Sequence, residues 1–372
     1  MIFNDYEDVP TIRTRSSELL AIGDLLPESK EKILPFVCLS KSNRVTDARV
    51  AYDKWNDKFK GPSILSLADN AKLAVDGYEI LTSPDNGFKS WIDFISDAKK
   101  INDNVIPSLV FNNSVGKRDF VKQLKNLESD FGPVVLKVNP LFRRDVAAAS
   151  TAASVISSTN NILFILDVGQ ITQTQQKAAL DATIQALNEL RSIDTSFDIV
   201  TTSTSFPRMF QGYTLNSSES YGEIPMLEWE NYHALGGKPV AKYGDYAGIH
   251  GEFYEGSYAK FVARIDYPTP SAWIFERRKQ SHPDEEREYL YSLAAQSIIT
   301  SESWDDSLKV WGSEIIREAA SNKLDKFGSP GKWISVRMNL HIERIIRFLS
   351  DNITIPSRTP TNGWEDDWND EI

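Results

Sequence analysis

Short apolar runs rich in β-branched residues alternate, over the first 250 residues, with longer segments that have amphipathic helical spacing. The run at 162–168 is almost wholly apolar, and the segment at 172–193 is the clearest helix pattern. Continuous apolar strands are typical of parallel sheets that are covered on both faces. We predict strands at 9–15, 33–40, 62–68, 105–111, 134–139, 162–168, 197–204 and 241–249, and a short extra strand at 78–81.

Eight strands that alternate with helices predict an α/β protein built on a (β/α)8 TIM-like barrel at residues 1–250. A doubly wound open sheet is the alternative. Against it, neither Gly-x-Gly-x-x-Gly nor Gly-x-x-x-x-Gly-Lys-Ser/Thr follows any predicted strand. A first strand that begins at Val9 places the eighth at Tyr243-Gly244-Asp245-Tyr246, and brings Arg13, Arg15 and Asp245 together where the barrel closes.

The pattern changes after residue 250. Segments 258–266 and 272–277 alternate like two strands joined by the turn Pro268-Thr269-Pro270, which predicts a β-hairpin. Helical spacing follows over 285–300, 303–321 and 334–351. We therefore expect residues 251–352 to form a C-terminal β-hairpin and a helical region packed on the barrel.

The last segment, residues 353–372, is predicted to be a flexible acidic tail. Residues 362–372 contain five acidic side chains and no basic one, and such a composition favours disorder in a free chain. Trp364, Trp368 and Ile372 are spaced along this tail, and aromatic side chains supply much of the energy of protein interfaces. We expect these three residues to dock on a protein partner, in cis or in trans; a solubilising terminus is the alternative.

Composition restricts the class of protein. Of the 372 residues 41% are hydrophobic and 25% are charged, as in ordinary globular domains. The net charge of −11 disfavours direct binding to nucleic acid or to an anionic membrane, because both need a basic surface. The single cysteine, Cys38, forms no disulfide within the chain, and neither a signal peptide nor an apolar run of about 18 residues is present. These features predict a cytoplasmic protein.

Candidate site residues are the polar groups at the carboxyl ends of the strands, where barrel loops converge on one mouth. They are Arg13, Arg15, Asp69, Asn112, Lys137, Asn139, Asp167, Thr201, Ser203, Tyr243 and Asp245. Lys137 interrupts one apolar strand and Asp167 ends the next, and buried charges are costly unless they are paired. We therefore predict a salt bridge between them, which either faces a ligand or closes the top of the barrel.

Other signatures of chemistry are missing. The four histidines, at 233, 250, 282 and 341, are scattered, so we expect no metal site and no cofactor. Gly-x-Ser-x-Gly is absent, which argues against an α/β-hydrolase. Paired carboxylates for glycoside hydrolysis need no proximity in sequence and stay open. Asp245 can bind a ligand or cap a loop.

Several short motifs together resemble the phage T4 beta protein family. They are Tyr6-x-x-x-Pro10-x-x-x-x-Arg15-x-x-Glu18, Ser205-Phe206-Pro207, Tyr243-Gly244-Asp245-Tyr246, Arg264-x-x-Tyr267 with Trp273 and Arg277, Trp311-Gly312 and Asn339-x-His341. The resemblance spans most of the chain and adds Arg264 and Arg277 as candidate ligand-binding residues. The chain departs from the family at Lys137, where the family tends to have arginine, and at Leu227-Glu228-Trp229-Glu230, where it tends to have Arg-x-Glu.

The resemblance implies an association with phages and bacterial anti-phage loci, and it implies no reaction. One hypothesis is an interaction or sensor component in phage–bacterium conflict, whose barrel recognises a protein or small ligand. It would act with a separate effector, such as a nuclease or a toxin-like partner. The alternative is a barrel hydrolase or phosphodiesterase on a phosphorylated substrate, with Lys137, Asp167 and Asp245 as candidate catalytic residues in one open pocket.

Overall fold

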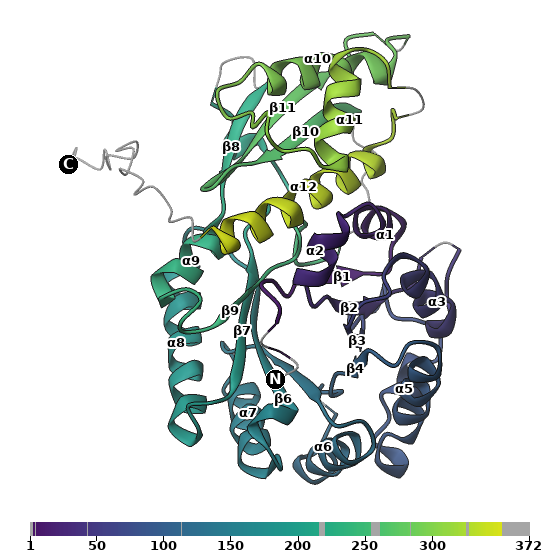
Figure 1. The fold of residues 1–372 in the computed structure, drawn as a ribbon, viewed down its shortest axis with the longest axis vertical. Coiled ribbons are helices and arrows are strands. Elements are labelled where there is room, and N and C mark those ends of the chain that lie inside the picture. Colours follow the sequence, from purple (N-terminus) through teal and green to yellow (C-terminus); the bar gives the residue numbers. More distant parts are fainter. Residues whose placement is uncertain are drawn as a thin grey trace, which may run out of the picture.

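The computed structural model of the chain describes residues 3, 5–42, 44–112, 114–215, 220–253, 261–282, 284–324 and 327–351. Within them, strands and helices alternate over the first two thirds of the chain, as the sequence predicts (Figure 1). The acidic tail with Trp364, Trp368 and Ile372 lies outside the described residues. Its docking role therefore stays a prediction.

Two parallel sheets of four strands each form the centre of this part. The first has the order β1-β2-β3-β4 and the second the order β5-β6-β7-β9. The strands are β1 (Thr11–Arg13), β2 (Phe36–Leu39), β3 (Ser63–Leu67), β4 (Val105–Pro107), β5 (Val134–Val138), β6 (Ile162–Gln170), β7 (Asp198–Thr204) and β9 (Lys242–Gly244). All six pairings within these sheets are parallel.

Isolated bridges connect the two sheets at both edges. Ser108, directly after β4, makes a parallel bridge with Val135 of β5. Asp8, before β1, makes a parallel bridge with Tyr243 of β9, and the amide of Thr11 donates to the carbonyl of Asp245 at 2.7 Å. Gly244 permits this approach, because a Cβ there would lie 2.9 Å from the carbonyl oxygen of Val9. The edges of the two sheets therefore lie beside each other on both sides.

Helices surround the strands (Figure 1). They are α1 (Ser16–Gly23), α2 (Pro27–Lys32), α3 (Ala48–Lys58), α4 (Tyr78–Leu81), α5 (Lys89–Ile101), α6 (Lys117–Phe131), α7 (Arg143–Val155), α8 (Gln176–Ile193) and α9 (Leu227–Leu235), with short 3-10 turns at Asp85–Gly87, Thr159–Asn161 and Gln211–Tyr213. The apolar face of α5 is buried at Trp91 and Ile95. Asp47 caps α3 by accepting hydrogen bonds from the amides of Arg49 and Val50.

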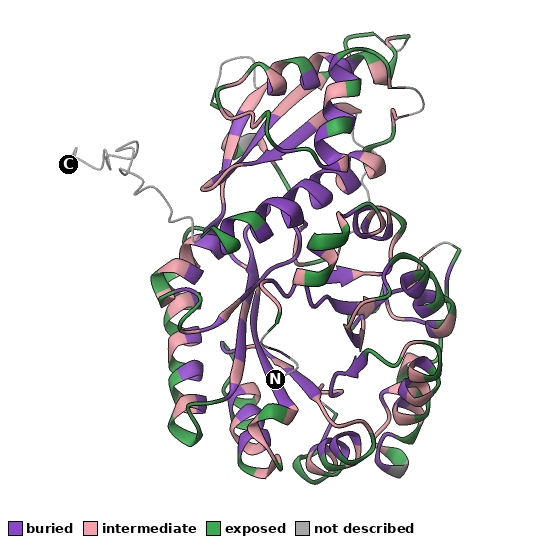
Figure 2. Cartoon of the chain, viewed as in Figure 1, coloured by how far each residue is buried: buried purple, intermediate pink, exposed green. Residues whose placement is uncertain are grey.

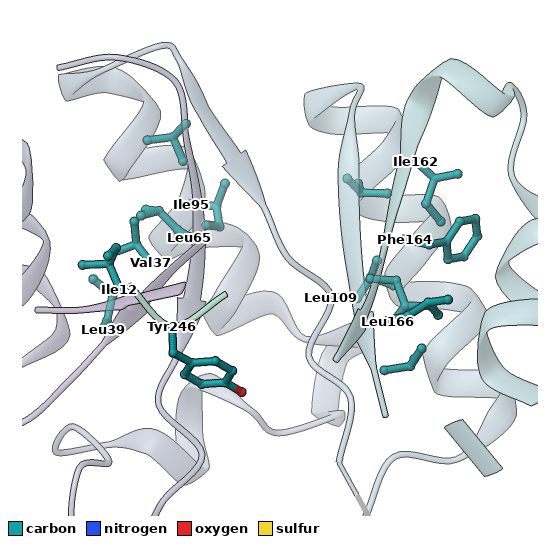
Figure 3. Packing of buried hydrophobic residues seen from close by; sticks show 14 of the residues in the cluster. Ile12, Val37, Leu39, Leu65, Ile95, Leu109, Ile162, Phe164, Leu166 and Tyr246 are labelled. Carbon is teal, nitrogen blue, oxygen red and sulfur yellow. The ribbon is translucent and has the colours of Figure 1, made fainter. Parts of the chain in front are cut away.

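Alternating strand residues enter two different cores, which explains the continuous apolar runs. One core lies between strands and helices, and Figure 3 shows Ile12, Val37 and Leu65 from one sheet and Phe164 and Leu166 from the other. The inner core contains residues from most of the strands of both sheets. They are Phe3, Val9, Leu34, Phe36, Ile64, Ile106, Val135, Leu163, Ile165 and Val200. The strands are thus covered on both faces, as parallel strands require.

The C-terminal region contains the predicted hairpin. β10 (Val262–Pro268) pairs antiparallel with β11 (Ala272–Lys279). An unpredicted strand, β8 (Tyr221–Pro225), joins β11 from the segment between β7 and α9. The helices are α10 (Arg287–Ile299), α11 (Trp311–Ala320) and α12 (Pro330–Ser350). α12 lies between this sheet and the rest of the chain and is buried over most of its length (Figure 2).

Three local predictions were wrong. Residues 78–81 form the helix α4 rather than a strand, and the helix predicted at 303–321 begins only at Trp311. The predicted eighth strand at 241–249 is reduced to β9, because Ala247 and Gly248 turn the chain with φ values of 51° and 71°. Among the described residues no helix is both long and apolar enough to cross a bilayer. The division into 1–250 and 251–352 stays a prediction.

Candidate functional site

A cavity of about 450 Å³ opens at the carboxyl ends of the strands. Its lining comes from β1, β2, β5 and β6 and from the segments that follow β3, β4 and β9. Of the predicted site residues, Arg13, Asp69, Lys137, Asn139 and Asp167 line it. Its volume lies within the range of about 300–1,000 Å³ that is usual for small-molecule sites. The structure thus brings five of the predicted site residues together around one cavity.

Lys137 on β5 and Asp167 on β6 form the predicted salt bridge, with 3.3 Å between Nζ and Oδ2. The lysine ammonium also lies 4.9 Å from the centre of the Phe36 ring. Burial lowers the pKa of Lys137, but the negative charge of Asp167 outweighs burial and raises the pKa above its ordinary value. Lys137 therefore keeps its proton at neutral pH. Its side chain is 28% exposed, so the charge still faces the cavity.

Asp167 has hydrogen-bond partners on both carboxylate oxygens. Oδ2 accepts from the hydroxyl of Tyr246 at 2.7 Å, and Oδ1 accepts from the amide of Gly169 at 2.9 Å. Gly169 has a φ of 72°, a conformation that glycine adopts without steric cost. Burial, and then the charge of Asp167, raise the pKa of Tyr246, so its hydroxyl stays a donor. Asp167 is thus held in place from two sides.

Arg13 borders the same cavity from β1. Its Nη2 donates to the carbonyl oxygens of His250 and Gly251, while its backbone amide donates to the carboxylate of Glu18. Burial raises the pKa of Glu18 to about 7, against the charge of Arg13. Arg13 is the register partner of Cys38 on β2. Burial raises the pKa of the Cys38 thiol to about 11, so it is not a thiolate at neutral pH.

The other predicted residues of this end lie around the cavity rather than in it. The Arg15 guanidinium lies 4.6 Å from the centre of the ring of Phe253, which does line it. Asn112 accepts a hydrogen bond from the amide of Ser114 at 2.9 Å. Ser203, together with Thr201, borders a separate small cavity of about 20 Å³ between β7 and α9.

Asp245 is sealed away from the cavity. Its Oδ2 accepts from the hydroxyl of Tyr243 at 2.9 Å and pairs with Nε2 of His341 on α12, and its Oδ1 accepts from the amide of Ala247 at 2.7 Å. Burial raises the pKa of Asp245, but His341 outweighs burial and holds it below its usual value. The side chains of Asp245 and His341 are 2% and 1% exposed. Asp245 therefore does not meet Lys137 and Asp167 in one open pocket.

The buried surroundings of Asp245 contain residues that the sequence reasoning did not select. Burial, followed by the charge of Asp245, raises the pKa of Asp8 well above its usual value. Glu228 accepts from the amide and the hydroxyl of Ser205, and burial raises its pKa to about 7. The signal for His341 was its place in the family motif.

Arg264 and Arg277 lie opposite each other in the C-terminal hairpin, and neither lines the cavity. Arg264 donates to Asp266 at 3.1 Å, and its guanidinium lies 3.5 Å from the centre of the ring of Phe210. The backbone amide of Arg277 donates to the carbonyl of Ser220. The structure therefore separates these two arginines from the residues at the mouth.

Sequence reasoning also missed part of the cavity lining. Asn70, Phe111, Asp145, Tyr246 and Glu252 border it. Asn70 directly follows the predicted Asp69, and the family motif contains Tyr246, so both had a signal; the others had none. In the part of the chain that the structure describes, no group of three or more His, Cys, Asp or Glu side chains is arranged to hold a metal ion.

The part of the chain that matches known proteins includes both the cavity and the sealed pair of Asp245 and His341. The family model for Beta protein matches residues 9–347. The chain is 34% identical over 346 residues to "Protein beta" of Enterobacteria phage P4, which spans 92% of this chain and 94% of that protein. The match begins before β1 and ends in α12, so it includes Lys137, Asp167, Asp245 and His341. The chain belongs to the Beta protein family.

Proposed function

We propose that this chain is a ligand-recognising (β/α)8 barrel, which senses a small molecule at its mouth and acts with a separate effector in phage–bacterium conflict. The observation that carries the proposal is the open cavity lined by Arg13, Lys137 and Asp167. Such a cavity at the carboxyl ends of parallel strands is the usual place of a binding site in this architecture.

Closure of the two sheets into one barrel is part of the proposal. The bridges from Ser108 to Val135 and from Asp8 to Tyr243 support it, because each joins an edge of one sheet to an edge of the other. The inner core supports it too, since Phe36 and Ile64 of one sheet pack in the same cluster as Val135 and Leu163 of the other. A closed barrel turns the loops after the strands toward a single mouth.

The protonation states favour binding over catalysis. Lys137 keeps its proton and cannot serve as a base at neutral pH. Cys38 is a thiol rather than a thiolate, so it is a poor nucleophile. Asp245, a candidate catalytic residue of the hydrolase alternative, is paired with His341 and does not line the cavity. A protonated lysine and a neutral thiol in the cavity suit recognition of a ligand better than base or nucleophilic catalysis by these two groups.

A cellular assay with a matched control tests this function. Bacteria that express the chain are challenged with phage, and plating efficiency is compared for the native chain, Lys137→Met and Lys177→Met. Lys177 is 85% exposed on α8, where it pairs with Asp181, so its loss leaves the cavity untouched. We expect Lys137→Met to abolish the effect of the chain on plating and Lys177→Met to preserve it. Equal plating for native chain and Lys137→Met contradicts the proposal.

The protein partner belongs to the same proposal and rests on the sequence of the tail. Trp364, Trp368 and Ile372 would dock on the effector, steered by the acidic residues between them. Deletion of residues 363–372 is expected to remove the effector from the tagged chain during purification from phage-challenged cells. An effector that co-purifies equally with the shortened chain removes the tail from the proposal.

A further inference from the structure

Among the less exposed residues of the cavity lining, the groups that can still hydrogen-bond to a ligand are mainly donors. Within the described residues, the Lys137 ammonium makes the ion pair with Asp167 and donates no hydrogen bond. Arg13 uses only its Nη2, on backbone carbonyls. A lysine carries three N–H donors and an arginine five, so several of these donors have no acceptor among the described residues.

Two asparagines add further donors. The side-chain oxygen of Asn70 accepts from the amide of Lys72, and that of Asn139 accepts from the amide of Leu141. Their Nδ2 groups have no acceptor in the part of the chain that is described. Because an amide side chain offers two donors at its nitrogen, both residues can still donate to a ligand.

The two cations lie at the same place. Arg13 and Cys38 are register partners on β1 and β2, so their side chains share a face of the sheet. Lys137 reaches toward β2 from β5, where its ammonium lies over Phe36, two residues before Cys38 and on the same face. The charges of Lys137 and Arg13 lower the pKa of the Cys38 thiol and that of Asp69 raises it, so all three lie near this residue.

The exposed part of the cavity lining has the opposite character. Asp69 and Glu252 belong to it. Neither carboxylate has a hydrogen-bond donor among the described side chains. A ligand that fits both parts therefore brings acceptors and negative charge to the less exposed part, and hydroxyl or amine donors to the exposed part.

We propose that the cavity binds a small polar metabolite through an oxyanion, a phosphate or a carboxylate group, held between Arg13 and Lys137 with help from Asn70 and Asn139. Hydroxyl or amine groups of the same molecule contact Asp69 and Glu252. This inference rests on the proposed function, because it names the class of ligand for the same cavity. Charge-assisted hydrogen bonds of this kind are about twice as strong as neutral ones.

Cys38 supplies a direct readout of occupancy. It is the only cysteine of the chain and it lines the cavity, so alkylation by N-ethylmaleimide reports on one site. The rate is measured on the full chain by intact-protein mass spectrometry in inorganic phosphate, in malonate and in chloride at equal ionic strength. At ten times the dissociation constant, we expect phosphate or malonate to slow alkylation about tenfold relative to chloride. Protection by phosphate alone or by malonate alone identifies which oxyanion the site takes.

Variants show whether the protection comes from the two cations. Because Lys137 itself affects the thiol, each variant is judged by its own ratio of rates with and without oxyanion. Lys137→Met is expected to lose the protection, Lys137→Arg to keep it, and the exposed control Lys177→Met to match the native chain. Circular dichroism verifies that each variant is folded. Equal protection in Lys137→Met and in the native chain overturns the proposal.

The same assay separates this inference from the proposed function. If no oxyanion protects Cys38 while a fraction of neutral metabolites from phage-challenged cells does, the oxyanion assignment is overturned and the cavity remains a binding site. If neither oxyanions nor metabolite fractions change the rate, both the inference and the proposed function fail.

Discussion

Asp167 at the open mouth and Asp245 in the sealed region are two carboxylates in nearly the same local arrangement. Asp167 accepts from the hydroxyl of Tyr246 and from the amide of Gly169, two residues further on, and it faces the ammonium of Lys137. Because 28% of the Lys137 side chain is exposed, solvent or a ligand can share the charge of this pair.

Asp245 repeats the pattern with different neighbours. It accepts from the hydroxyl of Tyr243 and from the amide of Ala247, again two residues further on, and it pairs with His341. Here the basic partner comes from α12 and is 1% exposed. Two carboxylates with similar local hydrogen bonds thus differ in the access of solvent to their basic partner, which is 28% exposed for Lys137 and 1% for His341.

The largest expected effect comes from removing the basic partner in the sealed region. His341→Ala leaves the carboxylate of Asp245 buried and without its main counter-group, and such a loss typically costs about 3–5 kcal/mol. Urea unfolding gives the free energy of unfolding. The double variant with Asp245→Asn is the control, and it should lose less than the two single losses together. A loss below about 1 kcal/mol for His341→Ala would contradict a structural role for this pair.

The pH dependence of stability tests two buried carboxyls, Glu228 near Asp245 and Glu18 near Arg13. Burial raises the pKa of Glu228 from 4.5 to about 7, so the folded chain holds this proton more tightly than the unfolded chain. The contribution of Glu228 to the free energy of unfolding is fully present at or below pH 4.5. It is lost as the pH rises to about 7, and it does not change further above that pH. Glu228→Gln should reduce the change in unfolding free energy between pH 5 and 7.5 by about 2–3 kcal/mol.

Glu18, which accepts from the amide of Arg13, gives a second test of the same kind, since burial raises its pKa to about 7 as well. Glu18→Gln should flatten the same part of the pH profile. An unchanged profile in either variant would show that its carboxyl is not held protonated by the fold.

A smaller effect on stability is expected at the open mouth. Lys137→Met leaves Asp167 with its hydrogen bonds from Tyr246 and Gly169, and solvent in the cavity can replace the ammonium. We expect a loss of about 1–2 kcal/mol in urea unfolding, less than for His341→Ala. A loss as large as that of His341→Ala would assign Lys137 and Asp167 to a structural pair that closes the barrel.

The alternation of strands and helices and the pairing of Lys137 with Asp167 were predictable, because both depend on local pattern. A charge in an apolar strand needs a partner, and the neighbouring strand offered one carboxylate at a similar height, two residues beyond the register partner Ile165. The hairpin of β10 and β11 was predictable for the same reason, since its strands are adjacent in sequence.

Features set by distant contacts were not predictable. β8 pairs with β11, so that Glu223 lies opposite Ile274, and no local signal marks such a pairing. Asp245 meets His341, which is 96 residues away, and its sealing depends on how α12 packs. The helix at Tyr78–Leu81 follows Gly77, whose φ of 77° turns the chain before it. A strand pattern over four residues could not reveal this turn.

The smallest expected effect concerns the residues that follow the two carboxylates by two positions. Gly169 has a φ of 72°, and a Cβ added there would meet nothing within 4 Å, so Gly169→Ala carries only the backbone cost of about 1 kcal/mol. Ala247 already bears this cost at a φ of 51°, but its methyl group is fully buried and contributes about 0.8 kcal/mol. Ala247→Gly should therefore change the free energy of unfolding by less than about 0.5 kcal/mol. If urea unfolding shows a clear gain in stability for Ala247→Gly, the turn after Asp245 is more strained than the turn after Asp167, and the two local arrangements are less alike than their hydrogen bonds indicate.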